Sequence, residues 1–463
     1  MVSARVFSIL AGFTLLTACT FDPEQTFNDT VSNIDTAVGT SFSGPAAMSG
    51  LVVGDEPFAI KAGASVLADG GSAADAVTAM YFALSVTYPV AASLGGGGIC
   101  IAQDSQSGTT REFDFLARDA NRGGAYAVPG NVRGFSALQS TFGKLSWRRT
   151  LAPAEGLAAA GFPISRALAV RLNAAKDVIR LDADLAAEFI DESGDVKSAG
   201  EVVYNRALAE TLAAIRIGGA NAFYGGATAS ALVSYAASQG GTISLDELRG
   251  YQPQLGSPRV FRVGNHTAFV PTARVGAGAF AGIMIDNLSK AATADANLET
   301  AASVAVKAAL ESFGVTTLPN DMGSTGFAAA DANGQAVACA VTMNGAFGSG
   351  HNAAGTGVTL ARAPASGQAG LAAAFLTPVL ATDSNGAIAM SGAAAGGPNG
   401  TAAITYALFR LANGAPLTRP GDLRTTGVAP FEMVNAIVCQ GGTCAALPDP
   451  GGSGVGISAD SVK

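Results

Sequence analysis

The sequence predicts an α+β protein in which antiparallel sheets are layered against helices. Two observations support this fold class: apolar positions recur at helical spacing through the first half of the chain, and strand–turn–strand patterns dominate the second half. The strict alternation of strands and helices that is typical of a parallel sheet is not found. Hydrophobic residues make up 49% of the 463 residues and charged residues only 13%, so the chain can bury a large core.

The first predicted elements are two helices at 58–86. Asp69-Gly70-Gly71-Ser72 interrupts their apolar spacing, because a glycine pair ends one helix and Ser72 can cap the next. Four glycines at 95–98 then lead into an apolar strand. Glycines before a strand are the reverse of the dinucleotide fingerprint, and no phosphate-loop motif occurs, so nucleotide binding is not expected.

Later segments follow the same logic. Several helices are predicted between 151 and 214, another at 227–239, and a short one after Ser244, which can form a capping box with Glu247. From residue 259 the pattern becomes β-like. Two hairpins are predicted around the turns 331–334 and 383–386, both with an Asn-Gly pair, and a helix at 401–411.

Composition excludes several classes of function. Lys and Arg number 27 against 35 Asp and Glu, and the chain has no long basic run, so nucleic acid is not an expected partner. Only two histidines, His266 and His351, are present, which leaves no three-histidine zinc site. A Ser-His-Asp triad would depend on one of these two residues. Neither a metal nor another cofactor is expected.

The N-terminus indicates export. Arg5 and a short apolar run make residues 1–18 similar to a signal peptide, too short to span a bilayer. Leu16-Thr17-Ala18-Cys19 resembles the bacterial lipobox, so we expect lipidation of Cys19 and a tether over 19–45; the alternative is conventional cleavage beside an ordinary cysteine. Thr20, in place of the Asp that favours inner-membrane retention, indicates an outer-membrane anchor facing the periplasm.

Export makes disulfides plausible. A Gly441-Gly442 turn would place Cys439 opposite Cys444 in a hairpin, with a geometry suited to a disulfide. Cys100 and Cys339 lie in apolar, strand-like runs, where buried free thiols are expected in preference to catalytic ones; whether the two pair with each other is left open.

A series of segments in order resembles the gamma-glutamyltransferase (gamma-glutamyl transpeptidase) family of N-terminal-nucleophile hydrolases. Together they span most of residues 46–456, and they are 66–76, 95–99, 128–130, 151–154, 161–165, 218–224 and 245–251. The resemblance implies a four-layer αββα sandwich, made from one precursor that cuts itself into two subunits. It implies a larger part over 46–323 and a smaller part over 324–463, in a divergent lipoprotein member of the family.

The resemblance also implies the nucleophile. Residues 342–350, Thr-Met-Asn-Gly-Ala-Phe-Gly-Ser-Gly, match the family's "TLNxxFGSG" segment, and counting back places Ser324 where the family has threonine. Thr325 is the alternative nucleophile. The hydroxyl would attack the carbonyl of Gly323, and the freed α-amine, with a pKa near 8, would then serve as the base. No histidine is needed.

Other site residues are carried over in the same way. Thr342 matches the hydroxyl that orients the nucleophile, and Asn344 matches a substrate contact. Gly396-Gly397 matches the glycine pair whose N–H groups form the oxyanion hole. From the residues alone, each of these is also explained as a strand threonine, a turn former or a flexible turn.

The residues that recognise glutamate match less well. The family arginine that pairs with the substrate α-carboxylate corresponds to Leu116, and Arg118 or Arg122 would have to replace it, with Arg118 the candidate binding residue. The family's acidic segment corresponds to 360–365, which has no carboxylate, and its serine pair to 374–378, which has none.

We therefore expect an autoprocessing amidohydrolase or acyltransferase that cleaves a gamma-glutamyl, glutathione-like or related amide or peptide through a covalent acyl-enzyme. Two alternatives stay open. One is an inactive envelope lipoprotein of the same fold that serves as a binding or structural module, and the other is an acylase for a non-glutamyl amide.

Overall fold

The structure is a computed structural model that describes residues 50–104, 106–272, 276–293, 297–424 and 430–462. The predicted signal peptide at 1–18, the lipidation site Cys19 and the tether at 19–45 lie outside the described residues. Within those ranges, no helix combines the length and the apolar character that crossing a bilayer requires.

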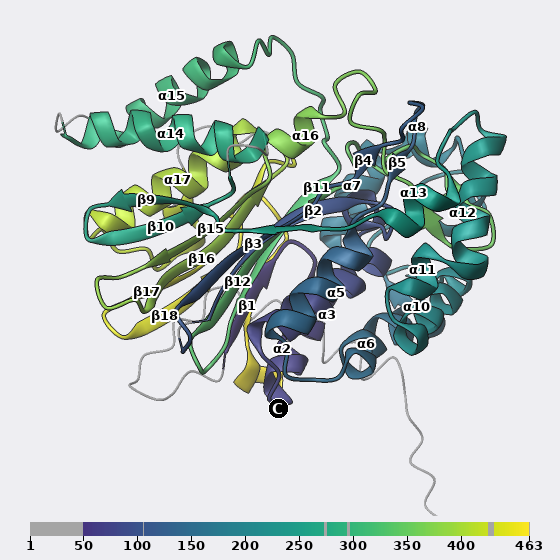
Figure 1. Cartoon of the computed structure of the whole chain (residues 1–463), viewed down its shortest axis with the longest axis horizontal. Helices are drawn as coiled ribbons and strands as arrows, with labels where there is room; N and C mark the ends of the chain where they lie inside the picture. The colour runs from purple at the N-terminus through teal and green to yellow at the C-terminus, as the bar shows by residue number, and fades with distance from the viewer. Residues whose placement is uncertain (1–49, 105, 273–275, 294–296, 425–429, 463) are drawn as a thin grey trace, which may run out of the picture. The chain divides into compact units, whose positions relative to one another are not determined.

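Two antiparallel sheets pack face to face in the middle of the fold (Figure 1). The first has seven strands in the order β19 (Val455–Ser458), β1 (Leu51–Gly54), β11 (Ser324–Ala330), β12 (Gln335–Thr342), β2 (Gly97–Asp104), β3 (Thr109–Phe115) and β8 (Gln254–Gly256). The second has six, in the order β18 (Thr443–Leu447), β17 (Met433–Gln440), β16 (Ile388–Ala395), β15 (Thr377–Thr382), β10 (His266–Val270) and β9 (Arg259–Val263).

Small side chains allow the two sheets to approach closely. At Gly326 on β11, a Cβ would lie 3.0 Å from the carbonyl oxygen of Ala393 on β16. Buried apolar residues fill the layer between the sheets, among them Ile99, Ala340 and Leu376. Because both faces of these strands are covered, they read as continuous apolar runs and not as alternating ones.

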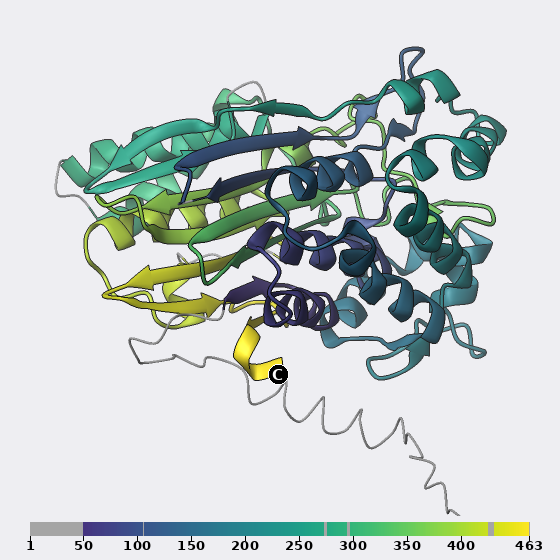
Figure 2. The same ribbon diagram turned by 60° about the horizontal axis from the view of Figure 1, so that its bottom comes forward.

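Helices cover the outer face of each sheet (Figures 1 and 2). On the first sheet these are α2 (Pro57–Ala68), α3 (Ala73–Thr87) and α5 (Asn131–Phe142), with α6 (Trp147–Ala160) packed on α3. On the second they are α14 (Gly276–Thr293) and α17 (Pro398–Ala412), with α15 (Leu298–Ser312) packed against both. The expected four-layer αββα sandwich is confirmed.

Most predicted elements are present. Ser72 and Asp75 form the capping box that separates α2 from α3, and the turns 331–334 and 383–386 join the β11–β12 and β15–β16 hairpins. The remaining elements are α4 (Pro89–Ala92), β4 (Arg118–Asp119), β5 (Ala127–Val128), β6 (Phe162–Pro163), α7 (Arg166–Ala174), α8 (Lys176–Ile179), α9 (Ala183–Phe189), β7 (Val202–Val203), α10 (Arg206–Gly218), α11 (Asn221–Tyr224), α12 (Gly226–Ser238), α13 (Leu245–Gly250), β13 (Asn352–Ala353), β14 (Val358–Thr359), α16 (Leu371–Ala374) and the 3₁₀ turns Pro420–Leu423 and Ala459–Val462.

The β-like pattern predicted from residue 259 is wrong beyond β10. The helices α14 and α15 follow it, and together they bury Phe280, Met284, Leu288, Ala305 and Ala309 against the second sheet and α17. The spacing of four and eight residues between the first three is helical, so the signal was in the sequence.

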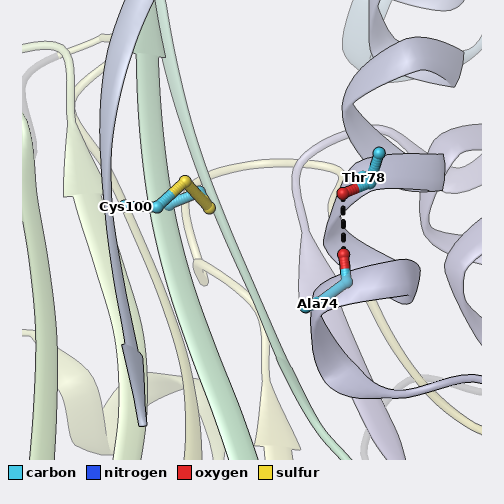
Figure 3. Close-up of a disulfide and its surroundings, with 4 residues drawn as sticks. Ala74, Thr78 and Cys100 are labelled. Carbon is cyan, nitrogen blue, oxygen red and sulfur yellow. Dashed lines mark hydrogen bonds between the residues drawn. A yellow bond between two sulfur atoms is a disulfide. The ribbon is translucent and has the colours of Figure 1, made fainter. Parts of the chain in front are cut away.

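Two disulfides cross-link neighbouring strands. Cys439 and Cys444 are bonded across the β17–β18 hairpin as predicted. Cys100 on β2 and Cys339 on β12 are also bonded, so the expectation of buried free thiols is wrong (Figure 3). The two residues face each other in the strand register with Cα atoms 4.1 Å apart, although 239 positions separate them in the chain. Figure 3 also shows Thr78 on the covering helix, its hydroxyl donating to the carbonyl of Ala74 at 2.7 Å.

Candidate active site

Ser324 and Thr342 lie directly opposite each other where β11 begins and β12 ends. The hydroxyl of Ser324 is 2.9 Å from Thr342 Oγ1, to which it can donate, and 3.2 Å from the carbonyl oxygen of Met322. Both side chains are buried. The tight Asp331–Gly334 turn sets the hairpin register, and this register brings together two hydroxyls 18 residues apart.

The carbonyl oxygen of Gly323 is held by two donors. The N–H of Met343 donates to it at 2.8 Å, and Thr342 Oγ1 lies 3.2 Å away with its hydroxyl able to donate. Negative charge would develop on this oxygen if Ser324 attacked the Gly323 carbonyl. The two donors therefore have the arrangement of an oxyanion hole for cleavage of the Gly323–Ser324 bond.

Asn344 forms its hydrogen bonds with Thr342 and Arg362. Its backbone N–H donates to Thr342 Oγ1 at 2.9 Å, and its side-chain amide donates to the carbonyl of Arg362 at 2.8 Å. The residue has a positive φ of 58°, a conformation that Asn tolerates better than most residues. The structure thus places Asn344 beside Thr342 with its side-chain amide already engaged.

Gly323 packs tightly against a neighbouring loop. Its φ is +59°, and a Cβ there would lie 1.9 Å from the carbonyl oxygen of Gly345. Any other residue would both strain the backbone and displace this neighbour. The bond before Ser324 is therefore held between a strand and a closely packed loop.

Thr325 points its hydroxyl at a different group. Its Oγ1 donates to Asp55 Oδ2 at 2.6 Å, because neighbouring residues of a strand face opposite sides of the sheet. Asn435 donates to the other carboxyl oxygen at 2.7 Å. Burial raises the pKa of Asp55 to about 6, and the hydrogen bonds from Thr325 and Asn435 limit the rise.

Arg171, which the sequence did not single out, contacts the same segment. From helix α7 its Nη1 donates to the carbonyl of Ser324 at 2.9 Å. Its Nε donates to Asp321 Oδ2 at 3.1 Å, and its Nη2 pairs with Asp321 Oδ1. Asp321 also accepts the N–H of Gly323 at 2.7 Å. The only sequence signal was a cation on the apolar side of α7, between the buried Leu168 and Leu172.

The guanidinium of Arg171 remains charged. Burial works against its charged form, but Asp321 and Tyr88 outweigh burial, so the pKa of Arg171 lies above its usual range. The Arg171–Asp321 pair spans the Gly323–Ser324 bond: the arginine holds the carbonyl after this bond, and the aspartate holds the N–H before it.

The predicted glycine pair forms the turn between β16 and α17. Gly396 has a φ of +90°, and a Cβ there would lie 1.9 Å from the carbonyl oxygen of Phe431. Gly397 is extended, and a Cβ there would lie 2.3 Å from Glu432 Cδ. Glu432 accepts the N–H groups of Asn399 and Gly400 at the start of α17. Burial raises the pKa of Glu432 against these hydrogen bonds.

Phe431 connects this turn to Arg171 and, through it, to Ser324. The centre of its ring lies 5.2 Å from the Arg171 guanidinium, which in turn binds the Ser324 carbonyl. Among the described residues, none accepts a hydrogen bond from the N–H of Gly396 or Gly397. These two N–H groups are the ones that the resemblance assigns to an oxyanion hole.

The predicted binding residue Arg118 is engaged by Gln252 and Tyr251. It lies on β4, donates to the carbonyl of Gln252 at 3.0 Å, and covers the ring of Tyr251 at 4.6 Å. Leu116 packs against the layer between the sheets. Arg362 is joined to the segment after β12, because its backbone N–H donates to the carbonyl of Met343 at 3.2 Å.

Arg362 is exposed and carries an unneutralised charge. Its Nε donates to the carbonyl of Gly348 at 2.8 Å, and no described acidic side chain forms an ion pair with it. The segment where the family has acidic residues therefore carries a cation here. Over the described ranges, no cluster of three or more His, Cys, Asp or Glu side chains could hold a metal ion.

Comparison with known proteins identifies the family. The model of the gamma-glutamyltranspeptidase family matches residues 59–313, more than half of the chain. The chain belongs to the gamma-glutamyltranspeptidase family. The matched residues end before Ser324, so the assignment of the site residues depends on the geometry described above.

Curated relatives match about half of the chain. Glutathione hydrolase 2 of Arabidopsis thaliana is 34% identical over 227 residues, which are 46% of this chain and 39% of that protein. The glutathione hydrolase proenzyme of Bacillus subtilis is 29% identical over 231 residues, covering 45% and 39%. The chain thus spans well under half the length of these relatives.

Among solved structures, cephalosporin acylase from Bacillus halodurans is similar over 90% of this chain and 98% of that one. Its TM-score is 0.68 and its sequence identity 18%. At this identity the similarity concerns the fold, which matches the αββα sandwich of this gamma-glutamyltranspeptidase family member.

Proposed function

We propose that this chain is an autoprocessing amidohydrolase or acyltransferase of the gamma-glutamyltranspeptidase type, with Ser324 as its nucleophile. The observation that carries the proposal is the geometry at Gly323-Ser324. A buried hydroxyl, its hydroxyl partner Thr342 at 2.9 Å and a carbonyl oxygen with two donors surround one peptide bond. The hydrogen bond from Thr325 to Asp55 favours Ser324 over its neighbour.

In the first step, Ser324 Oγ attacks the carbonyl carbon of Gly323, and the hydroxyl proton is transferred to the nitrogen of the breaking peptide bond. The charge on the Gly323 oxygen is stabilised by the Met343 N–H and the Thr342 hydroxyl. The peptide C–N bond breaks, and the nitrogen of Ser324 takes the proton. Water then hydrolyses the resulting ester, which releases a carboxylate on Gly323 and a free α-amine and hydroxyl on Ser324.

In the second step, the α-amine acts as the base. Its ordinary pKa near 8 suits proton transfer at neutral pH. Ser324 Oγ attacks the amide carbonyl of a substrate, and the Gly396 and Gly397 N–H groups hold the oxyanion. The leaving amine takes a proton, and water or an acceptor amine then attacks the acyl-enzyme.

The substrate class is an acyl amide or peptide. The names of the curated relatives support a gamma-glutamyl compound such as glutathione. The absence of a carboxylate in 360–365, with the exposed Arg362 in that segment, favours a second candidate, an acylase for an amide that lacks the α-amine. Hydrolysis of gamma-glutamyl p-nitroanilide compared with glutaryl p-nitroanilide distinguishes the two.

The expected location is the cell envelope. The lipobox-like segment ending in Cys19 supports a lipid anchor in the outer membrane facing the periplasm, and the two disulfides support an oxidising compartment. Incorporation of labelled palmitate into the wild type and not into a Cys19→Ser variant would test this location.

The self-cleavage proposal is tested by intact mass and reducing electrophoresis of the purified chain. Wild type should yield two fragments, the smaller beginning at Ser324. Ser324→Ala should remain whole, whereas Thr325→Ala, the matched control, should still be cut. A wild-type chain that stays whole through long incubation would refute self-cleavage, and a new terminus at Thr325 would reassign the nucleophile.

A further inference from the structure

Arg171 binds an aspartate that belongs to the segment released by self-cleavage. Two of its nitrogens bind the two carboxyl oxygens of Asp321, and its third binds the Ser324 carbonyl. The arginine side chain is only 2% exposed and that of the aspartate 9%. A buried guanidinium next to the nucleophile is therefore occupied by a carboxylate that lies just three residues before Ser324.

Arg171 lies between two aromatic rings beside Ser324. Its guanidinium lies 5.2 Å from the ring centres of both Tyr88 and Phe431. Phe431 is in contact with Gly396, so the guanidinium lies between the start of β11 and the glycine turn. An acyl group attached to Ser324, with its oxygen at the glycine pair, would have this cation within reach.

Asp321 belongs to a segment without regular secondary structure, and the buried pair with Arg171 is its link to another part of the fold. No helix or strand includes residues 313–323, between the end of α15 and Ser324, and most residues of 314–320 are partly or fully exposed. The other hydrogen bond of Asp321 is to Gly323, which belongs to the same segment. The next residue, Met322, is buried in a core cluster with Phe280 and Met284. Once the Gly323–Ser324 bond is cut, the segment is covalently attached only through α15, and departure of Asp321 would require Met322 to leave this cluster as well.

Departure of Asp321 would leave a buried cation without its partner. The nearby carboxyl of Asp55 is already engaged by Thr325 and Asn435, and Tyr88 offers a phenol. A buried charge that loses its partner is strongly destabilising, so the vacated position favours another anion. A carboxylate is the natural replacement, because a guanidinium binds its two oxygens together.

We propose that Arg171 binds the free carboxylate of the acyl donor, and that Asp321 occupies this position before self-cleavage as an internal substitute for it. The substrate class is an amide of an acyl group that carries a second, free carboxylate, such as a glutaryl or gamma-glutamyl amide. The inference rests on the proposed function in taking Ser324 as the residue that receives this acyl group. Arg362 is the competing cation, and it serves as the comparison in the test.

The binding test uses glutarate and uncut chains, so it does not depend on catalysis. Ser324→Ala keeps Asp321 on Arg171, and the double variant Ser324→Ala/Asp321→Ala vacates the site. Calorimetry should show glutarate binding at least about tenfold more tightly to the double variant, and the gain should disappear on adding Arg171→Met but not Arg362→Met. Equal affinity in the single and double variants, or loss of binding only with Arg362→Met, would overturn the proposal.

A second comparison covers the case in which the Asp321 variant does not fold. Cleaved wild type should bind glutarate, and the uncut Ser324→Ala chain should not. Neutral butyramide should show no detectable binding to either protein.

A kinetic comparison tests the same site during turnover. Cleaved wild type should prefer glutaryl p-nitroanilide over butyryl p-nitroanilide by at least about tenfold in kcat/KM. Equal rates on both anilides would refute the carboxylate site but not the proposed acylase activity. A wild-type chain that is never cut would refute self-cleavage, and the glutarate test on the double variant would then decide the role of Arg171.

Discussion

Cys100 and Cys339 form a disulfide between strands that lie on opposite sides of the Gly323–Ser324 bond in the sequence. Cutting that bond would produce two fragments that this disulfide still joins. The second disulfide, Cys439–Cys444, lies entirely within the smaller fragment. After self-cleavage, Cys100–Cys339 would therefore join the two fragments, whereas Cys439–Cys444 would not.

The first prediction concerns electrophoresis of the cleaved wild type. Without reductant the chain should migrate as one band with a mass increased only by one water, and with reductant it should separate into two. Cys100→Ser should give two fragments even without reductant, whereas Cys439→Ser should not. Separation of unreduced wild type under denaturing conditions would contradict the Cys100–Cys339 link.

The second prediction concerns Thr342→Val, which keeps the shape of the side chain and removes its hydroxyl. It deletes both the partner of Ser324 Oγ and one donor to the Gly323 carbonyl. Loss of one oxyanion donor typically costs about 10²–10³ in rate, so self-cleavage should slow by at least that factor. Fragment formation over time measures the rate, and Thr359→Val, a buried threonine on β14, is the control that should be cut at close to the normal rate.

The third prediction compares two glycines in the left-handed region. Gly323→Ala would bring a Cβ within 1.9 Å of Gly345 O, whereas Gly314→Ala, at a φ of +66°, meets nothing within 4 Å. Both substitutions carry backbone strain, on the order of 1 kcal/mol, but only the first displaces the cut site. Gly323→Ala should block or greatly slow self-cleavage, and Gly314→Ala should leave it within a few-fold. Similar rates for the two variants would show that the packing at Gly323 does not control the reaction.

The fourth prediction concerns the pH dependence of stability due to Asp55. Its pKa rises from 3.8 to about 6 on folding, chiefly because of burial, so the folded state favours the protonated carboxyl. Asp55 therefore adds roughly 3 kcal/mol at most to the free energy of unfolding. This contribution is present in full below pH 4 and is lost as the pH rises through 6.

An Asp55→Asn variant should therefore lose less unfolding free energy between pH 4 and pH 7 than the wild type. Denaturant titrations of the uncut Ser324→Ala background measure it without interference from cleavage. The control is Asp177→Asn, whose side chain is 89% exposed, and its profile should follow the parent chain. If the free energy of unfolding of Asp55→Asn changed with pH in parallel with that of the parent, Asp55 would not be the source of the pH dependence.

The sequence predicted the local features of this protein better than its long-range contacts. The capped helix pair α2–α3, the two Asn-Gly hairpins and the Cys439–Cys444 link depend on residues within a few positions of one another. The placement of Ser324 opposite Thr342 could be counted from a matched segment, since one tight turn sets the register between them. The helices α14 and α15 were missed because alanine-rich segments after two strands gave a weaker periodic signal than the strands did.

The rest was decided by tertiary structure. Asp55 meets Thr325 across 270 positions, Cys100 meets Cys339 across 239, and Arg171 meets Asp321 across 150. Periodicity, caps and turns report only which face of an element is buried, and they carry no information on which distant element packs against that face. The sequence by itself therefore determined the fold class, the hairpins and the placement of the Ser324 hydroxyl opposite Thr342. Packing of two sheets and their helices decided which charges surround that hydroxyl, because only the folded core brings α7, β11 and the glycine turn together.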